Sequence, residues 1–248
     1  MGIGNKQIGW TNEANLLWEI GRKLERLIQV AGPAPTTTMA PVPGNVEIAA
    51  SSDFDITGNF TIEMFVNLSN LDGFARPYSF GAYPAPNAMS VEGGQLYFWA
   101  NGANLINGTF TPTLGTWYHI CVMGSGSTAY MFIDGFMVAN SPYGGTISST
   151  GLPLTIGYGN EPNSYFNGKI SNFRWNSTAL YSTSGFTVPT ATLPNIVGNK
   201  LLIFQGTNLP QQLSDLSGNG HNATNAGASY SASNPFVGTQ GSLQMGIV

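Results

Sequence analysis

The feature that most constrains this chain is a series of short segments with alternating apolar and polar residues, which runs from about residue 46 onward. Residues 60–68 (FTIEMFVNL) show this alternation most clearly. Further strand-like segments are 95–100, 117–123, 129–133, 136–139, 154–158, 166–175 and 200–204. Repeated short strands with turn-forming residues between them are typical of an all-β sandwich. We therefore expect residues 46–248 to form a two-sheet antiparallel sandwich.

A two-residue connection joins two of these segments. Asp134-Gly135 separates residues 129–133 from residues 136–139. An Asp-Gly pair favours the tight hairpin turn in which both central residues have positive φ, so we expect a β-hairpin here. In the segment 117–123, His119 and Cys121 share one face by strand parity. We expect Cys121 to be a buried free thiol, and His119 to be a core or sheet-face histidine rather than a metal ligand.

The N-terminal part follows a different pattern. Within residues 11–31, apolar residues are spaced three and four apart, and Gly32-Pro33 follows, which predicts a helix that ends there. A helix of this length is not stable alone in water. We therefore expect residues 1–31 to be an anchoring or oligomerisation segment. Its partner could be its own sandwich, identical helices of sister chains, or a larger assembly. The residues expected to make these contacts are Trp10, Leu17, Trp18, Ile20, Leu24 and Leu27.

Residues 32–45 join the two parts. This stretch (GPAPTTTMAPVPGN) is rich in proline and threonine, and its prolines favour an extended, semi-rigid spacer. The expected organisation is therefore a helical segment, a linker and a β-sandwich.

Composition excludes several function classes. Charged residues make up 8% of the chain and the net charge is −4, which argues against a nucleic-acid-binding face. A single cysteine excludes a disulfide within the chain. No apolar run approaches the roughly 18 residues of a membrane span, and no hydrophobic signal-peptide core is present at the N-terminus.

Five blocks together resemble the laminin-G-like jelly roll of the concanavalin A-like class, in order and in spacing. The blocks are 60–66 (FTIEMFV), 115–120 (GTWYHI), 130–135 (YMFIDG), 154–157 (LTIG) and 165–174 (YFNGKISNFR). This resemblance implies a lectin-like sandwich. The block at residues 8–20 (IGWTNEANLLWEI) is similar to leaders of structural proteins of tailed phages, cyanophages especially.

The second resemblance implies a non-catalytic virion protein: a capsid decoration, fibre or tail-associated protein that displays its sandwich outward. Its expected partners are other virion proteins and sister chains, in a homo-oligomer with a trimer as the first candidate. Such a protein would become extracellular on lysis, in agreement with the absence of a signal peptide. The alternative function is a carbohydrate-binding module that attaches to a host or environmental surface.

Catalytic and metal-binding constellations are not found in the sequence. The acidic residues are dispersed, and Glu63 lies on the face opposite Ile62 and Met64, where we expect it to face solvent. We therefore expect neither an enzyme nor a bound cofactor. The laminin-G resemblance leaves calcium as an alternative, although the candidate ligands Asp72, Asp134 and Glu161 are each isolated in loops.

Sugar recognition needs exposed aromatic rings bordered by amides and hydroxyls. Two expected loops, 78–87 and 158–165, have this composition, while Trp99 is expected in the core. The candidate glycan-contacting residues are Tyr78, Tyr83, Tyr158, Asn160 and Tyr165. The alternative is that these aromatics complete the core or form a subunit contact.

Overall fold

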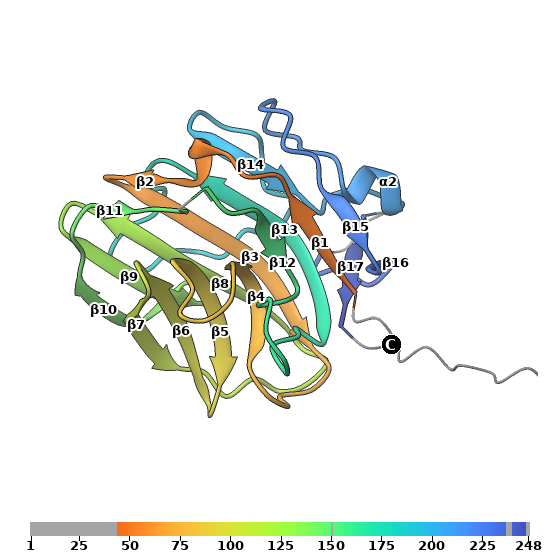
Figure 1. Cartoon of the computed structure of the whole chain (residues 1–248), viewed down its shortest axis with the longest axis horizontal. Helices are drawn as coiled ribbons and strands as arrows, with labels where there is room; N and C mark the ends of the chain where they lie inside the picture. Colours follow the sequence, from red (N-terminus) through yellow and green to blue (C-terminus); the bar gives the residue numbers. More distant parts are fainter. Residues whose placement is uncertain (1–43, 150, 237–239, 247–248) are drawn as a thin grey trace, which may run out of the picture. The chain divides into compact units, whose positions relative to one another are not determined.

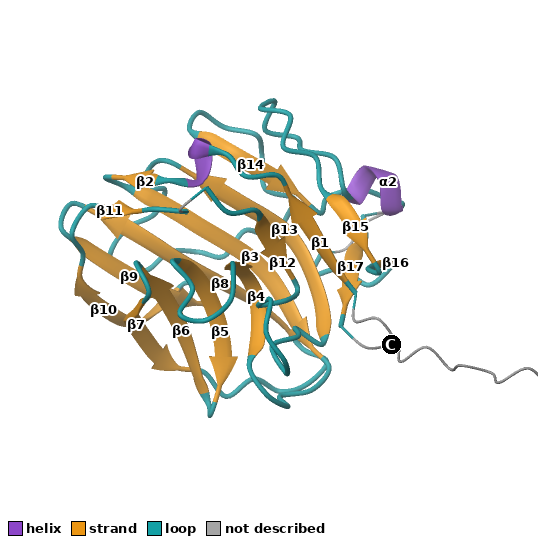
Figure 2. Ribbon diagram, viewed as in Figure 1, coloured by secondary structure: helices purple, strands orange, loops and turns teal. Residues whose placement is uncertain are grey.

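The computed structural model describes residues 44–149, 151–236 and 240–246. These residues form two stacked antiparallel sheets, with two short helical turns between strands (Figures 1 and 2). The all-β sandwich expected from the sequence is therefore confirmed. The helix predicted within residues 1–31, and the linker up to residue 43, lie outside the described residues.

The first sheet has seven strands. In spatial order they are β15 (Thr224–Ala226), β1 (Asn45–Ile48), β12 (Leu154–Ile156), β4 (Ala75–Phe80), β5 (Asn87–Glu92), β6 (Gln95–Ala100) and β7 (Ala103–Thr109). Neighbouring strands run antiparallel.

The second sheet has eight strands, of which β14 (Asn199–Ile203) pairs with β13 beside the main path. The others, in spatial order, are β10 (Phe136–Pro142), β9 (Thr128–Ile133), β8 (Trp117–Ser125), β3 (Phe60–Leu68), β13 (Gly168–Asn176), β17 (Ser242–Met245) and β16 (Ser229–Ser231). The small elements are η1 (Ser52–Phe54), β2 (Ile56–Thr57), β11 (Thr146–Ile147) and α2 (Leu209–Gln212).

The predicted hairpin is confirmed. Ile133 pairs directly with Phe136, and the two residues between them have positive φ, 48° at Asp134 and 77° at Gly135. The Asp134 side chain also accepts a hydrogen bond from the backbone N–H of His119, at 2.8 Å. The turn is thereby tied to the neighbouring strand β8.

The core lies between the two sheets and is rich in aromatic rings. The Trp175 ring, on β13, makes edge-on contacts with Phe54, Tyr78 and Phe80, with ring centroids 5.7–5.9 Å apart. Such edge-to-face pairs add to the stabilisation that comes from burying the apolar area. The described ends also meet: Gly44 and Gly246 exchange backbone hydrogen bonds, so β1 and β17 lie close together (Figure 1).

The eight-stranded sheet is covered on its outer face by residues 177–197, which we call the covering segment. From it, Tyr181 and Phe186 pack on a buried cluster formed by Cys121, Met123 and Phe132. Together with Phe236, whose ring meets Phe65 edge-on, this packing buries the outer face of β3 as well as its inner face. The predicted burial of Cys121 is confirmed.

Glu63 is fully buried beneath the covering segment, so the expectation that it faces solvent is wrong. Its carboxylate accepts hydrogen bonds from Arg174 Nε at 2.7 Å and from the Tyr181 hydroxyl at 2.7 Å, and lies 2.8 Å from His119 Nε2. His119, expected to be a core or sheet-face histidine, is buried. Alternation along β3 placed Glu63 on the correct face but could not show that a later segment covers that face.

The outer face of the seven-stranded sheet is more open. Along β6, buried residues alternate with partly exposed ones. Tyr97 and Trp99 are the partly exposed aromatics, and they lie opposite the buried Leu96 and Phe98. The expectation that Trp99 belongs to the core is therefore wrong, because its ring lies on the outer face of this sheet.

Candidate functional site

A hollow of about 330 Å³ lies on the open side of the seven-stranded sheet. We call it the aromatic groove. Strands β4, β5 and β6 contribute Arg76, Glu92 and Trp99, and neighbouring loops contribute the remaining residues. The lining residues are Phe74, Arg76, Tyr83, Glu92, Trp99 and Glu161.

Aromatic rings form one wall of the groove. Tyr83 meets Trp99 edge-on, with ring centroids 5.3 Å apart, and Tyr97 stacks beside Trp99 at 6.4 Å. The Trp99 indole N–H donates a hydrogen bond to the Ser90 hydroxyl at 3.3 Å, which fixes the ring orientation. Tyr83 is 55% exposed, so its ring is available to a ligand. Rings held in this way can pack against the C–H face of a sugar.

Arg76 forms the polar floor of the groove. It is only 4% exposed, and its Nη2 atom lies 2.5 Å from Glu161 Oε1. Within the described part of the chain, however, Arg76 Nε and Nη1 have no hydrogen-bond partner. Buried polar atoms are nearly always satisfied, so two unpaired donors at one site suggest that a ligand supplies the missing bonds.

A glycine allows Arg76 to take this position. A Cβ atom added at Gly159 would lie 2.3 Å from Arg76 Cδ and 2.9 Å from Arg76 Nε. Any larger residue at this position would displace the guanidinium. The loop between β12 and β13 therefore holds Arg76 against Glu161 and leaves two donor nitrogens free.

The electrostatic environment of the groove affects both Arg76 and Glu92. Burial lowers the pKa of the Arg76 guanidinium, although the neighbouring Glu161 and Glu92 carboxylates oppose this shift. Burial raises the pKa of Glu92, with Arg76 and a hydrogen bond from Ser90 acting in the opposite direction. Each group is thus held in a partly desolvated site, where a hydrogen bond from a ligand has a larger effect than in water.

A second hollow, of about 410 Å³, shares Phe74 with the aromatic groove. We call it the loop hollow. Its lining residues are Asn70, Asp72, Gly73, Phe74, Asn163, Tyr165 and Asn167. Tyr165 stacks on Tyr158 with nearly parallel rings, at a centroid distance of 4.5 Å. Through Phe74 the aromatic groove thus adjoins a hollow that is lined by amides and a second aromatic ring.

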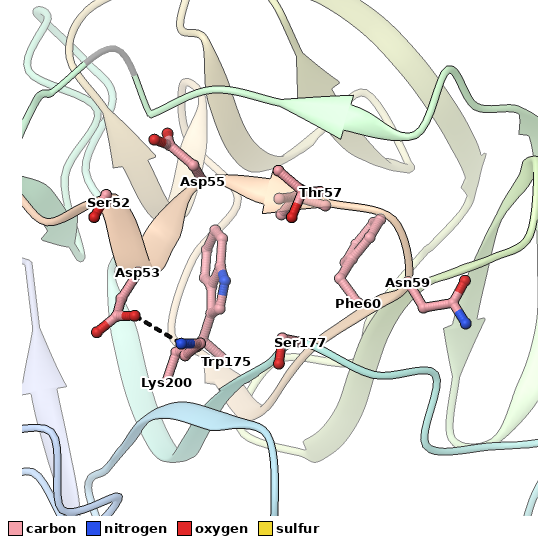
Figure 3. Close-up of a pocket in the computed structure, with 10 residues that line it drawn as sticks. Ser52, Asp53, Asp55, Thr57, Asn59, Phe60, Trp175, Ser177 and Lys200 are labelled. Atoms are coloured by element: carbon pink, nitrogen blue, oxygen red, sulfur yellow. Dashed lines mark hydrogen bonds and ion pairs between the residues drawn. The ribbon is translucent and has the colours of Figure 1, made fainter.

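A third hollow, of about 360 Å³, lies near η1, and we call it the η1 hollow (Figure 3). Its acidic groups are already paired. Asp53 accepts a hydrogen bond from Lys200 Nζ at 2.7 Å, and Asp55 accepts one from the Ser149 hydroxyl at 2.9 Å. No lining atom of this hollow is among the unsatisfied buried atoms of the described residues, in contrast to the aromatic groove. The unsatisfied atoms thus favour the aromatic groove.

The sequence-predicted glycan residues are not all brought together. Tyr83 lines the aromatic groove, Tyr165 lines the loop hollow, and Asn160 is exposed beside Glu161. The prediction is wrong for Tyr78, because this residue lies on strand β4 with its side chain fully buried. Its hydroxyl donates a hydrogen bond to Asn87 Oδ1 within the core, at 2.9 Å.

Sequence reasoning missed the centre of the site. No sequence pattern marks Arg76 or Glu92 as a site residue, since a single charged residue in a short strand is typical of any solvent-facing position. A pattern does mark Trp99: alternation in residues 95–100 places it on the face opposite Leu96 and Phe98, and parity could have identified it. Glu161 lies within the predicted glycan loop 158–165, but by itself it is predicted only as a possible calcium ligand.

Metal-binding groups are dispersed in the structure as they are in the sequence. No cluster of three or more His, Cys, Asp or Glu side chains occurs in residues 44–149, 151–236 and 240–246. Asp72 and Glu161 line different hollows, while Asp134 belongs to the hairpin turn. The helical elements of the same described residues, η1 and α2, fall well short of a membrane-spanning length.

Antiparallel two-sheet sandwiches occur among lectin domains, although the architecture alone does not define a function. Residues 43–184, more than half of the chain, match the concanavalin A-like lectin/glucanases superfamily. The protein therefore belongs to this superfamily, as the laminin-G-like blocks of the sequence indicated. No curated protein sequence matches the chain.

Solved structures share the fold at low sequence identity. A candidate carbohydrate binding protein from Bacteroides ovatus ATCC 8483 is 18% identical, with a TM-score of 0.56, and the match covers 75% of this chain and 58% of that protein. A heptameric SAP-like pentraxin from Limulus polyphemus is 18% identical, with a TM-score of 0.45, over 59% of this chain and 75% of the pentraxin. The Bacteroides likeness supports the fold, and this chain spans little more than half of that protein's length.

Proposed function

We propose that this chain is a non-catalytic carbohydrate-binding module and that the aromatic groove is its glycan site. The observation that carries the proposal is the buried Arg76, whose Nε and Nη1 atoms have no partner among the described residues, beside the Tyr83–Trp99 wall. A concave site with aromatic walls and a few convergent polar groups is the usual form of a small-molecule site. Superfamily membership and the fold shared with the Bacteroides protein support the same function.

The roles of the groove residues follow from their chemistry. Tyr83 and Trp99 pack on the apolar face of a sugar ring, while Arg76 donates to ring or hydroxyl oxygens and Glu161 accepts from a hydroxyl. Both kinds of contact orient the sugar. Neither transfers a proton or forms a bond to carbon, so the site binds without reacting.

The proposal is tested by measuring glycan binding with the full-length protein and two variants, Trp99→Ala and Phe136→Ala. Removing the Trp99 ring is expected to weaken binding by about tenfold or more, which corresponds to roughly 1.4 kcal/mol. Phe136 is 77% exposed on β10 of the other sheet, so its removal should leave the affinity unchanged. Equal affinity of the Trp99→Ala variant and the unaltered protein would show that the groove is not the site.

A second proposal concerns assembly, and it rests on the sequence of residues 1–31. We propose that this segment anchors the module in a phage particle, as a capsid decoration, fibre or tail-associated protein, with sister chains in a trimer. The apolar stripe of Leu17, Ile20, Leu24 and Leu27 supports it, because a short amphipathic helix needs a partner. Display on a particle and glycan binding are compatible.

Light scattering tests the assembly proposal. The full-length chain is compared with a chain that begins at Pro41, which keeps the Gly44–Gly246 hydrogen bonds. We expect a trimer for the first and a monomer with an unchanged unfolding temperature for the second. A full-length monomer would contradict self-association, and a trimeric shorter chain would assign association to the sandwich instead.

A further inference from the structure

The charges that line the aromatic groove are unequal in number. Of its six lining residues, Arg76 is the only cation, while Glu92 and Glu161 are both acidic. The adjoining loop hollow adds a further acid, Asp72, and its described lining residues include no cation. The surface that a glycan would follow therefore has an excess of negative charge.

The remaining lysine and arginine side chains of the described residues lie outside the groove. Arg174 is buried against Glu63 under the covering segment, and Lys200 is paired with Asp53 near η1. Lys169 lies on β13, in the other sheet. Arg76 itself is partly neutralised by Glu161, at 2.5 Å. No second positive group among these residues lines the groove to balance an anionic ligand.

The unpaired donors of the groove lie beside a carboxylate. Arg76 Nε and Nη1 lack an acceptor among the described residues, and Glu161 Oε1, which contacts Arg76 Nη2, is an adjacent acceptor with further lone pairs. A sugar hydroxyl both accepts and donates, so a pair of hydroxyls can satisfy the arginine and the carboxylate together. A ligand carboxylate or sulfate only accepts; it would accept from Arg76, but it would donate nothing to Glu161 and would be repelled by that carboxylate.

From these observations we infer that the aromatic groove selects neutral glycans, with neighbouring hydroxyls bound across the Arg76–Glu161 pair, and excludes glycans that carry uronate or sulfate groups. The inference rests on the proposed function and specifies its ligand class. Electrostatic repulsion by Glu92 and Glu161 is then the source of the specificity, since the aromatic wall would accept neutral and anionic sugars alike. Like charges placed against a competing ligand are a common means of specificity.

The test compares matched ligands on the full-length protein: neutral hexose oligosaccharides, and their uronate and sulfated counterparts of the same length and linkage. Neutral ligands are expected to bind at least about tenfold more tightly at low salt. The ratio of the affinities for neutral and anionic ligands should decrease as the salt concentration rises to about 1 M, because screening weakens the repulsion. Equal or tighter binding of the uronate or sulfated ligands would overturn the inference and leave the proposed function intact.

Two variants test the origin of the preference. Glu92→Gln removes one negative charge inside the groove without changing the side-chain shape, and it should reduce the neutral-to-uronate ratio by several-fold. Glu47→Gln is the control, because Glu47 is exposed on β1 of the same sheet and outside the groove. An unchanged ratio in Glu92→Gln would overturn the inference. Binding of no glycan of any class would overturn the proposed function, and the inference with it.

Discussion

At the scale of single residues, Glu63 shows how an acid can be structural in a chain with few charges. It forms a buried network with Arg174, His119 and Tyr181, beneath the covering segment. Burial alone would raise the pKa of Glu63, but the hydrogen bond and charge of His119, together with Arg174 and Tyr181, outweigh it and lower the pKa below its ordinary value. The carboxylate is therefore held ionised inside the protein.

Glu63→Gln should destabilise the sandwich strongly. The substitution leaves the Arg174 guanidinium buried without its counter-charge, and breaking a buried pair in this way costs about 3–5 kcal/mol. For a domain of this size that corresponds to a fall in Tm on the order of 6–20 °C. The control Glu47→Gln lies on an exposed site and should stay within about 0.5 kcal/mol of the unaltered protein. Similar Tm values for the two variants would contradict a stabilising role for the network.

The lowered pKa of Glu63 also predicts how the stability of the folded protein depends on pH. The pKa of Glu63 in the folded protein is below its ordinary value of 4.5. The stabilisation of the folded state by ionised Glu63 is therefore complete above pH 4.5, and it is lost as the pH falls through the lowered pKa of the folded protein. Thermal unfolding from about pH 6 to about pH 3 should therefore show a falling Tm below about pH 4.5. Glu63→Gln should lose less Tm over this range, and an equal loss in both proteins would assign the acid sensitivity to other carboxylates.

At the scale of elements, the β9–β10 hairpin turn is also a packing surface. A Cβ atom added at Gly135 would lie 2.0 Å from the backbone oxygen of Phe186, in the covering segment. The Phe186 N–H also donates a hydrogen bond to the Gly135 carbonyl at 3.0 Å. Gly135 is thus required both for its positive φ and for the close approach of a second backbone.

Gly135→Ala is expected to be clearly more destabilising than Gly126→Ala in the neighbouring β8–β9 turn. Both positions have positive φ, 77° and 61°, so each alanine carries a backbone cost of about 1–2 kcal/mol. Only Gly135 meets another backbone, because nothing lies within 4 Å of a Cβ atom at Gly126. The clash should add about 1–3 kcal/mol, measurable by denaturant unfolding. Equal losses would mean that the covering segment moves aside without cost.

The sequence predicted individual strands and turns better than it predicted which segments pack against one another. Residues 60–68 and 95–100 form strands with the predicted bounds, and the Asp134-Gly135 turn has the predicted φ values, since local alternation and turn chemistry determine these features. The burial of Glu63 could not be predicted in this way. It depends on a segment more than a hundred residues later, whose position is determined by long-range packing.

At the scale of the whole molecule, the two sheets differ in how much of their outer faces is covered. The covering segment buries the part of the eight-stranded sheet's outer face that β3, β8 and β9 form, whereas the seven-stranded sheet leaves Tyr97, Trp99 and the groove partly open. Tyr83 was predicted from its loop composition, and it is the one sequence-predicted residue that lines the groove. Arg76, Glu92 and Glu161 meet only because β4, β5 and the β12–β13 loop are neighbours, and no local pattern contains that information.

The sandwich is completed by residues beyond the superfamily match, which ends at residue 184. Strand β13 pairs with β3 on one side and with β14 and β17 on the other, so both later strands supply edges that it needs. They also supply fully buried core residues. These are Leu201, Ile203, Leu243 and Met245. Each such side chain contributes about 1.5–3 kcal/mol on burial, and their sum is comparable to the whole stability of a domain, about 5–15 kcal/mol.

A chain that ends at Ser184 should therefore fail to fold, whereas a chain that ends at Gly246 should unfold at the same temperature as the full-length protein. The shorter chain loses the Phe186 contact, β14 and β17, while the longer one keeps the hydrogen bonds between Gly246 and Gly44. Circular dichroism and thermal unfolding distinguish the two outcomes. A cooperative transition in the chain that ends at Ser184 would mean that the matched region is a self-sufficient domain. Because β15, from the same C-terminal stretch, also extends the seven-stranded sheet at β1, loss of the C-terminal strands would affect the sheet that carries the groove as well as its partner.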